Sequence, residues 1–486
     1  MKLFNHQVDA ARFAIENGGN VAIWHEMGLG KTRTAIEIFS YYRTQDPDVR
    51  MLVICPISLL EGAWGQDINR FSNFKYHNSH EWGIPQGQVA PSITLINFEG
   101  LRSEARAKDL IDLIQKSKVN WLCVIDESSR MKSHSTETTK TLLKRFRGLF
   151  KYKLVMSGTP APNSEMEYWG QMEFIRPGIF SNSFFKFRNT FFHLQRGKQI
   201  LPTIGFMSKT GIADVFSKGF KYEITDANRQ KLMATIRKYS HFAKKKDCLD
   251  LPDQVDEERV VELGPKQKRA YREMKTQLLT EIGGEDITAP VALAKLMKLR
   301  EITSGFAIGE SGSPVAIGEE PKVKEMMDTI EEAGTQQIII WANFHWEILR
   351  ICHELRSLFK KVDPVTGKMV IDQEEADRQI VTLYGGTADR DGSITAFQDG
   401  RARFLVAHPR SAAHGLTFVG CSLQIFFSLD YSSESYEQAR ARTHRAGQKN
   451  VCTYVHLIAK DTIDGDILDI LRKKKTAADV ILKFKS

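Results

Sequence analysis

The chain has 486 residues, of which 42% are hydrophobic and 26% charged, so it can form the cores of two or three globular domains. Its formal net charge of +9 favours a polyanionic partner. No apolar run approaches the roughly 20 residues that span a bilayer, and residues 1–13 lack the hydrophobic core of a signal peptide. We therefore expect a cytoplasmic protein with no membrane partner.

Apolar runs in the first third of the chain predict the buried strands of a parallel sheet. Each run ends in polar or turn residues, as strands do when functional loops follow their carboxyl ends. A helix is predicted over 32–43, directly after the first run, from the spacing of its apolar residues. The predicted strands lie at 21–24, 51–56, 93–98, 121–127 and 153–160.

The middle of the chain, from about 165 to 320, is rich in Phe, Lys and Arg and has few strand-like runs. We expect it to be helical and protruding, with a crossover near 249–254 and loops at 284–290 and 309–314. A second series of predicted strands then alternates with helical stretches, so the fold class is α/β in two lobes. These strands lie at 337–344, 379–386, 402–409, 423–430 and 451–459.

Cysteine usage predicts neither a disulfide framework nor a structural zinc site. The six cysteines are scattered and form no C-x-x-C pair. We expect all of them to be reduced and to lie in or near the core: Cys55, Cys123, Cys248, Cys352, Cys421 and Cys452.

The segment WHEMGLGKT (24–32) lies between a predicted strand and a predicted helix, which is the context of a phosphate-binding loop. Gly28 and Gly30 allow backbone amides to approach an anion, Lys31 adds positive charge, and the Thr32 hydroxyl is suited to Mg²⁺. His25 stands where the general pattern has its first glycine. The alternative is a tight strand-to-helix turn with a surface lysine.

Two adjacent acids, Asp126 and Glu127, end the predicted strand at 121–127. Buried carboxylates are costly unless they serve a partner, and magnesium with an attacking water would supply one. Asp126 would hold Mg²⁺ through its water shell, and Glu127 would polarise the water. The alternative is an exposed acidic pair that caps the following helix.

Basic clusters and aromatic residues give weaker signals. The basic clusters at 144–153, 237–246 and 472–475 are each more typical of a solvated helix face than of a binding site. Trp341 and Trp346 are predicted to lie in the core of the second lobe. A further group of aromatic residues could stack on bases, but their spacing favours a helical core face: Trp64, Phe184, Phe185, Phe187, Phe191 and Phe192.

Several motifs in order resemble those of superfamily 2 helicases and translocases, specifically the Swi/Snf-like branch, over nearly the whole chain. The compact length is most similar to prokaryotic or phage-encoded members. The matching segments are NHQ (5–7), EMGLGKT (26–32), VICPISLLEGAW (53–64), INFEGLR (96–102), VIDESSRMKS (124–133), MSGTPAPNS (156–164), IIIWANF (338–344), HGLTF (414–418) and QARARTHRAGQ (438–448).

The resemblance implies two RecA-like lobes with ATP between them. The first would cover 1–250 with a helical protrusion at about 165–250, and the second 251–486 with a protrusion at about 260–320. Gln7 would read the adenine edge, while Arg442 and Arg445 would reach the γ-phosphate from the second lobe. The nucleotide would also contact Met27, Gly28, Leu29, Gly30, Lys31, Thr32 and Gly415.

The resemblance also assigns contacts to the nucleic-acid backbone and a coupling role. Hydroxyls, amides and an imidazole would grip phosphates without reading sequence, at Ser58, Asn97, Thr159, Ser411, His414 and Thr417. Hydrolysis would be linked to lobe movement through Gly158, Thr159, Gln438 and Gln448. The chain departs from the family's usual D-E-A-H, because Ser128 and Ser129 follow the acids. This change bears on coupling, since both catalytic carboxylates are kept.

The sequence therefore predicts a monomeric, ATP- and Mg²⁺-dependent motor on DNA that would work in the host cytoplasm if it is phage-encoded. The interpretation that we favour is a duplex translocase that remodels forks or branched DNA. A strand-separating helicase is one alternative. A nucleotide-gated DNA-binding scaffold with negligible turnover is another.

Overall fold

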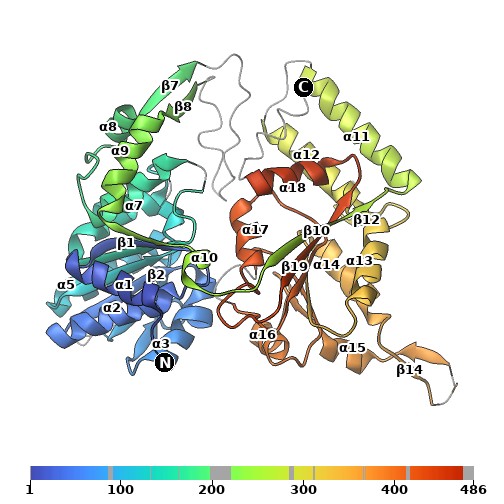
Figure 1. Cartoon of the computed structure of the whole chain (residues 1–486), viewed down its shortest axis with the longest axis horizontal. Coiled ribbons are helices and arrows are strands. Elements are labelled where there is room, and N and C mark those ends of the chain that lie inside the picture. The colour runs from blue at the N-terminus through green and yellow to red at the C-terminus, as the bar shows by residue number, and fades with distance from the viewer. Residues whose placement is uncertain are drawn as a thin grey trace. The chain divides into compact units, whose positions relative to one another are not determined.

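The computed structural model describes residues 2–85, 91–131, 133–162, 164–196, 220–283, 289–309, 312–364, 366, 368–411 and 416–473. The chain forms two compact units, with the main division after Asp250. Each unit is built on a parallel sheet with helices on its faces (Figure 1), which confirms the predicted α/β class. Among the described residues, no helix has the length and apolar character needed to cross a membrane.

The first unit holds a sheet of seven parallel strands in the order β3-β4-β2-β5-β6-β1-β9. The five strands predicted in this part of the chain are all present. The strands are β1 (Asn20–His25), β2 (Arg50–Cys55), β3 (Tyr76–Asn78), β4 (Ile93–Asn97), β5 (Trp121–Asp126), β6 (Tyr152–Met156) and β9 (Ser240–Ala243).

Helices cover both faces of this sheet, and that is why its central strands are continuous apolar runs. Val21 and Ile23 of β1 pack in the layer of α1, α2 and α3, whereas Ala22 and Trp24 pack in the layer of α5 and α7. The helices are α1 (Asn5–Glu16), α2 (Lys31–Gln45), α3 (Gln66–Phe71), α4 (Ser79–Trp82), α5 (Glu104–Ser117), α6 (Glu137–Thr141), α7 (Tyr168–Ile175), α8 (Phe184–Phe191), α9 (Asp226–Arg237) and α10 (Lys245–Cys248).

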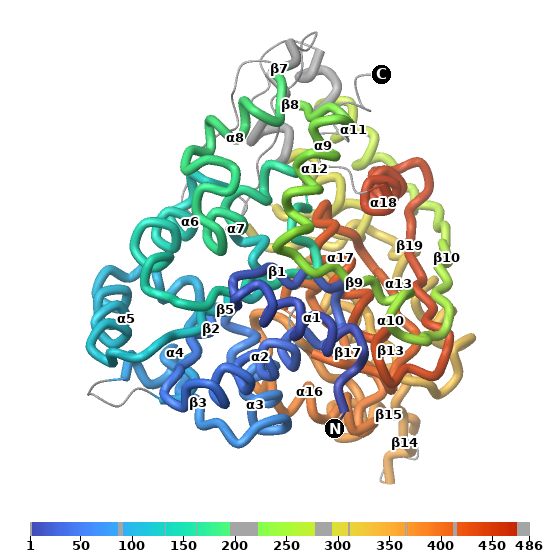
Figure 2. The backbone as a smooth tube through the Cα atoms, turned by 60° about the vertical axis from the view of Figure 1, so that its left-hand side comes forward, coloured from blue at the N-terminus to red at the C-terminus, as the bar shows by residue number. Residues whose placement is uncertain are grey.

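The second unit holds a sheet of six parallel strands in the order β10-β19-β18-β13-β17-β16. All five strands predicted here are present, and Figure 2 shows β10 running beside β19. The strands are β10 (Gln254–Val261), β13 (Ile338–Trp341), β16 (Ile380–Leu383), β17 (Phe404–Ala407), β18 (Leu423–Phe426) and β19 (Cys452–Ala459).

The helices of the second unit include α13, α14 and α15, which pack on one face of the sheet. The helices are α11 (Pro265–Gly283), α12 (Ala289–Thr303), α13 (Pro321–Glu332), α14 (His345–Arg356), α15 (Gln373–Gln379), α16 (Arg390–Gln398), α17 (Ser433–Arg440) and α18 (Ile463–Lys473). Short two-stranded sheets of this unit pair β11 (Phe306–Ile308) with β12 (Pro314–Ala316) and β14 (Lys360–Val362) with β15 (Met369–Ile371). A third two-stranded sheet, which lies mainly in the first unit, pairs β7 (Phe192–Arg196) with β8 (Phe220–Ile224).

The middle of the chain is less purely helical than the sequence predicts. β9 and β10 flank the crossover predicted near 249–254 and are edge strands of the two large sheets. An edge strand joins its sheet through backbone hydrogen bonds and needs no continuous apolar run, as the mostly exposed β10 illustrates. Of the two predicted loops, residues 284–288, 310 and 311 lie outside the described residues.

Most of the aromatic group identified in the sequence belongs to the core. Trp64, Phe187 and Phe192 are buried, whereas the Phe185 side chain is 57% exposed. Trp341 is fully buried, and Trp346 stacks on Phe306 with ring centroids 4.8 Å apart. All six cysteines are free thiols, and all but Cys248 are buried.

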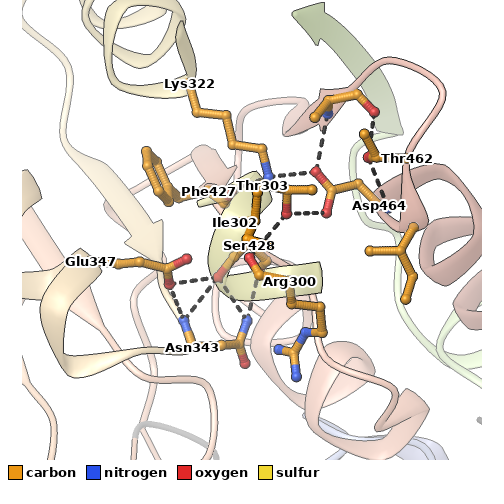
Figure 3. A network of polar contacts seen from close by, with 12 residues as sticks. Arg300, Ile302, Thr303, Lys322, Asn343, Glu347, Phe427, Ser428, Thr462 and Asp464 are labelled. Atoms are coloured by element: carbon orange, nitrogen blue, oxygen red, sulfur yellow. Dashed lines mark hydrogen bonds and ion pairs between the residues drawn. The ribbon is translucent and has the colours of Figure 1, made fainter. Parts of the chain in front are cut away.

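A buried ion pair and its hydrogen bonds join three helices of the second unit to the ends of two strands (Figure 3). The Lys322 amine of α13 lies 2.6 Å from Asp464 Oδ2 at the start of α18. Asp464 also accepts hydrogen bonds from the Thr303 hydroxyl at 3.0 Å and from the Ala459 amide at 3.1 Å. Lys322 donates in addition to the Phe427 carbonyl at 3.3 Å. The pair therefore joins α12, α13 and α18 to the carboxyl ends of β18 and β19.

Candidate nucleotide site

The predicted phosphate loop connects β1 to α2. Gly28 and Gly30 have φ values of 88° and 70°, which glycine adopts without strain. Gly30 is the residue that precedes α2, and a Cβ at this position would overlap the Gln7 amide nitrogen. Because α2 begins at the loop, the positive end of the helix dipole is directed at it, and no side chain caps the first turn.

Helix α1 holds the loop from the other side. The Gln7 amide donates to the Gly30 carbonyl at 3.2 Å and to the Leu29 carbonyl at 3.4 Å, and its Oε1 accepts from the Phe4 amide at 3.0 Å. The His6 Nε2 donates to the Leu29 carbonyl at 2.9 Å. The Gln7 amide is thus engaged with the loop itself, and the proposed adenine contact requires it to change partner.

Asp126 and Glu127 lie at the carboxyl end of β5, and both side chains are buried. Burial therefore contradicts the alternative of an exposed acidic cap. Asp126 Oδ2 accepts from the Trp64 indole at 3.0 Å, and Oδ1 accepts from the Glu127 amide at 3.0 Å. Burial raises the pKa of Asp126, while the charge of Lys31 and the Trp64 hydrogen bond lower it.

Trp64 is a site residue that sequence reasoning did not identify. It lies in the π-helical turn Leu60–Gly65, and its ring is in the core while its N–H reaches Asp126. A buried tryptophan usually finds an acceptor for its indole N–H, which was the available signal. The acceptor itself could not be known, because it lies 62 residues further along the chain.

Lys31 lies near both the phosphate loop and the acidic pair. Its amine donates to the His25 carbonyl at 3.2 Å, and its charge influences the pKa of Asp126. Thr32 follows in the first turn of α2 and is half-buried. The loop lysine and the carboxylate of β5 therefore belong to one electrostatic site.

The turn after β6 lies against the phosphate loop. A Cβ at Gly158 would approach Met27 Cγ to 2.8 Å and the Met27 amide nitrogen to 3.3 Å, so only glycine permits this contact. The Thr159 amide donates to the Ser157 hydroxyl at 3.1 Å. The Thr159 hydroxyl oxygen is buried and has no hydrogen-bond partner among the described residues.

Two further candidate residues follow neighbouring strands at the same edge of this sheet. Ser58 lies in the turn Ile57–Leu59 after β2 and is half-buried. Asn97 ends β4, and its amide donates to Glu99 Oε2 at 3.1 Å. Because the strands are parallel, these residues share an edge with Asp126 and Thr159.

The predicted arginines of the second unit follow α17. Arg442 is buried, and its Nε donates to the Gln438 carbonyl at 2.8 Å. Arg445 is partly exposed and donates to the Thr417 hydroxyl at 2.5 Å. Gln448 donates to the Cys421 carbonyl at 2.9 Å, which ties the end of this segment to the start of β18.

The remaining candidates of the second unit are only partly described. The Ser411 carbonyl accepts a hydrogen bond from Arg390. Thr417 contacts Arg445 as above, and its carbonyl accepts from Gln398 at 3.0 Å. His414 and Gly415 lie outside the described residues.

Arg440 is another residue to which the sequence assigned no role. It forms an ion pair with Asp256 of β10, in which the Nη2–Oδ2 distance is 2.9 Å. Its guanidinium also lies 3.9 Å from the ring centroid of Tyr454 in β19. These contacts fasten α17 to the edge of the sheet, and with it the start of the segment 438–448 that contains Arg442 and Arg445.

Three imidazoles are close together beside the phosphate loop. His25 Nε2 lies 2.8 Å from His241 Nδ1 of β9, and the rings of His25 and His6 are 5.7 Å apart. Burial, followed by the neighbouring His241 and Lys31, lowers the pKa of His25 from 6.5 to about 2. The folded protein therefore keeps His25 neutral.

This shift predicts an acid-sensitive stability. In the unfolded chain His25 takes up a proton near pH 6.5, whereas the folded site does not, so its contribution is complete above pH 6.5 and declines below it. Between pH 7.5 and 5.5 we expect this group to remove about 1.4 kcal/mol from the free energy of unfolding. Urea unfolding at both values should show a smaller loss for His25→Asn than for the native chain, and equal losses would contradict the assignment.

The residues at the end of β5 and the start of α2 fit a magnesium ion held jointly with phosphate. Among the described residues, no group of three or more His, Cys, Asp or Glu side chains could hold a metal alone. Mg²⁺ commonly takes one or two protein oxygens with waters and substrate phosphates, as Asp126 and Thr32 would supply. A cation there would also favour the ionised form of the buried Asp126.

Comparisons with known proteins identify the family to which the chain belongs. Residues 6–305 match the SNF2-related domain, and residues 321–447 match the helicase conserved C-terminal domain. Protein p41 of Acyrthosiphon pisum secondary endosymbiont phage 1 is 23% identical, over 99% of this chain and 96% of that protein. An uncharacterized ATP-dependent helicase of Mycoplasma pneumoniae is 24% identical over 93% of this chain, which spans only 39% of that relative.

The Sulfolobus solfataricus SWI2/SNF2 ATPase core, solved in complex with dsDNA, is 23% identical to this chain, with a TM-score of 0.43. The match covers 97% of this chain and 91% of the Sulfolobus chain. The SNF2-related match extends over more than half of the chain, and the helicase C-terminal match follows it in the second unit. The chain therefore belongs to the SNF2-related family, with a phage protein among its relatives, and is a DNA-dependent ATPase.

Proposed function

We propose that the chain is a motor that moves along duplex DNA and remodels forks or branched DNA without fully separating the strands. The observation that carries the proposal is the shared edge of the first sheet. There the phosphate loop and the acids of β5 adjoin Ser58, Asn97 and Thr159, so the groups for hydrolysis lie beside groups suited to a phosphate backbone.

In the proposed reaction Lys31 and the amino end of α2 hold the phosphates of ATP, and Gln7 contacts the adenine. Magnesium, held by Thr32 and by Asp126 through water, would supply positive charge beside the phosphates. Glu127 accepts a proton from the attacking water and orients it. Arg442 and Arg445 stabilise the charge that develops on the transferred phosphoryl group.

DNA contacts are proposed to be independent of sequence. The hydroxyls of Ser58, Thr159 and Thr417 and the amide of Asn97 can bond to phosphate oxygens, as can Ser411. The net charge of +9 favours the same partner. Residues 1–250 and 251–486 are the proposed lobes, and Gly158, Gln438 and Gln448 are proposed to couple hydrolysis to their movement.

Two assays at one fixed salt concentration test the task. Displacement of a third strand from a DNA triplex measures movement along duplex, and release of a labelled strand from a fork measures unwinding. We expect ATP-dependent triplex displacement with little strand release. Strand release without triplex displacement would identify a strand-separating helicase. DNA binding without DNA-stimulated phosphate release would identify a nucleotide-gated scaffold.

The proposed contact of Arg445 with the transferring phosphoryl group gives a separate prediction. Arg445→Ala should lower kcat for DNA-stimulated ATP hydrolysis by roughly 10³-fold, because an arginine that meets the transferring phosphoryl group contributes mainly in the transition state. Arg445→Lys should not restore it, since an ammonium cannot form the bidentate contact. Arg356→Ala, which removes a surface arginine of the same unit, is the matched control. Normal turnover in Arg445→Ala would exclude the assignment.

A further inference from the structure

A buried glutamine of α7 bridges two motif segments of the first unit, the one that contains Ser128 (124–133) and the one that contains Pro160 (156–164). Gln171 is fully buried, and its Oε1 accepts from the Ser128 hydroxyl at 2.7 Å. Its Nε2 donates to the Pro160 carbonyl at 2.6 Å and to the Glu167 carbonyl at 3.2 Å. A carbonyl can only accept, so the amide must point its nitrogen toward Pro160 and its oxygen toward Ser128.

Each end of this bridge adjoins a group at the nucleotide site. Ser128 directly follows Glu127, whose φ of 53° lies in the left-handed region. A non-glycine residue holds this conformation only where its surroundings impose it. The Glu127 amide is held by Asp126 on one side, and Ser128 is held by Gln171 on the other.

At the other end, Pro160 closes the turn whose Gly158 packs on Met27 of the phosphate loop. The Gln171 amide therefore links the backbone that follows Glu127 directly to the turn that contacts the loop. An apolar side chain of similar size would fill the same space, but it could satisfy neither the Ser128 hydroxyl nor the Pro160 carbonyl.

We propose that Gln171 is a positioning residue for ATP hydrolysis. It acts through Ser128 and Pro160 and sets the orientation of the Glu127 carboxylate relative to the turn at 157–160. The proposal deepens the proposed function and rests on the role assigned there to Glu127. It also gives a use to Ser128, one of the two residues at which the chain departs from the D-E-A-H pattern.

The test separates the two halves of the amide. Gln171→Glu keeps an acceptor for Ser128 but places an oxygen against the Pro160 carbonyl, and Ser128→Ala removes only the hydroxyl at the other end. With saturating duplex DNA, we expect Gln171→Glu to lower kcat roughly 10- to 100-fold, as misplacement of a catalytic group does. Ser128→Ala should lower it in the same direction, and KM for ATP should change less than about twofold in both variants.

A double-mutant cycle checks that the two residues act together. Ser128→Ala combined with Gln171→Met removes both polar partners, so the double variant should regain thermal stability relative to Gln171→Met. Its kcat should remain low, because the Ser128–Gln171 hydrogen bond that anchors the backbone after Glu127 is then absent. Recovery of kcat together with stability would overturn the proposal, since it would show that Gln171 matters only for folding.

Gln267 offers a matched control in the second unit. It is also buried, its Oε1 accepts from the Gly264 amide at 3.4 Å, and its Nε2 donates to the Ile302 carbonyl at 3.1 Å. Gln267→Met should lower the melting temperature and leave kcat per folded molecule unchanged. Unchanged kcat in both Gln171→Glu and Ser128→Ala would refute the positioning role.

The proposed role of Glu127 fails in a different way. Full ATPase activity in Glu127→Gln would show that the Glu127 carboxylate is not needed for hydrolysis. Gln171 would then have no catalytic group to position, and both proposals would be overturned. Loss of activity in Glu127→Gln with normal Gln171 and Ser128 variants would overturn only the further inference. The two failures are therefore distinguishable with one set of proteins and one assay.

Discussion

Glu127→Gln is expected to lower DNA-stimulated ATP hydrolysis by roughly 10²- to 10⁴-fold while ATP binding is kept. The amide has the shape of the carboxylate and tolerates the same backbone, but it cannot accept a proton from the attacking water. The nucleotide contacts that we assign to Lys31 and Thr32 are unaltered. Phosphate release at saturating DNA, set beside equilibrium binding of ATP, measures the two effects separately.

Glu104→Gln is the control for this change. Glu104 lies in the same unit at the start of α5, and its side chain is 83% exposed in a surface ion pair with Arg145. Its replacement should leave turnover unchanged. If phosphate release by Glu127→Gln equals that of the native chain, Glu127 is not the group that activates water, and a motor driven by this carboxylate is excluded.

Lys322→Met is expected to lower the free energy of unfolding of the second unit by about 3–5 kcal/mol. The side chains of Lys322 and Asp464 are only 3% and 6% exposed, so removal of the amine leaves a buried carboxylate without its counter-charge. Thr303 and Ala459 would still donate to it, but neither carries charge. Urea unfolding followed by circular dichroism measures the loss.

Two further variants identify the cause of that loss. Lys322→Met with Asp464→Asn removes both charges and should recover more than half of the lost free energy, because a buried pair is costly chiefly when one partner is left alone. Lys116→Met breaks a surface pair with Asp112, whose side chains are 73% and 42% exposed, and should change stability by less than about 0.5 kcal/mol. A loss below about 1 kcal/mol in Lys322→Met would show that water reaches the pair.

The central strands were predictable because each is a continuous apolar run bounded by polar or turn residues. β5 and β13 are clear cases, since all residues of both strands are buried in the structure. β9 and β10 were not predictable in this way. They lie at sheet edges and join through backbone pairing, which leaves little trace in their side chains.

The residues of the candidate site likewise include some that local sequence was enough to propose and some whose partners depend on packing. Gly28, Gly30 and Lys31 are adjacent in the chain, and Asp126 and Glu127 end a strand, so residue type and spacing were enough to propose them. Gln7 was proposed for adenine, whereas the structure shows its amide bonded to the carbonyls of the loop. A local pattern indicates which chemistry a side chain offers, but the partner that it meets depends on the packing of α1.

Short-range properties of the chain, namely apolar runs, glycine positions and adjacent charges, were sufficient to predict the α/β class and to propose the phosphate loop and the acidic pair. The Trp64–Asp126 hydrogen bond, the Gln171 bridge and the Lys322–Asp464 pair arose only from the tertiary structure. Their partners lie on different elements, separated by 62 residues in the first case and 43 in the second. Such contacts depend on how strands and helices pack, and neither spacing nor composition records that.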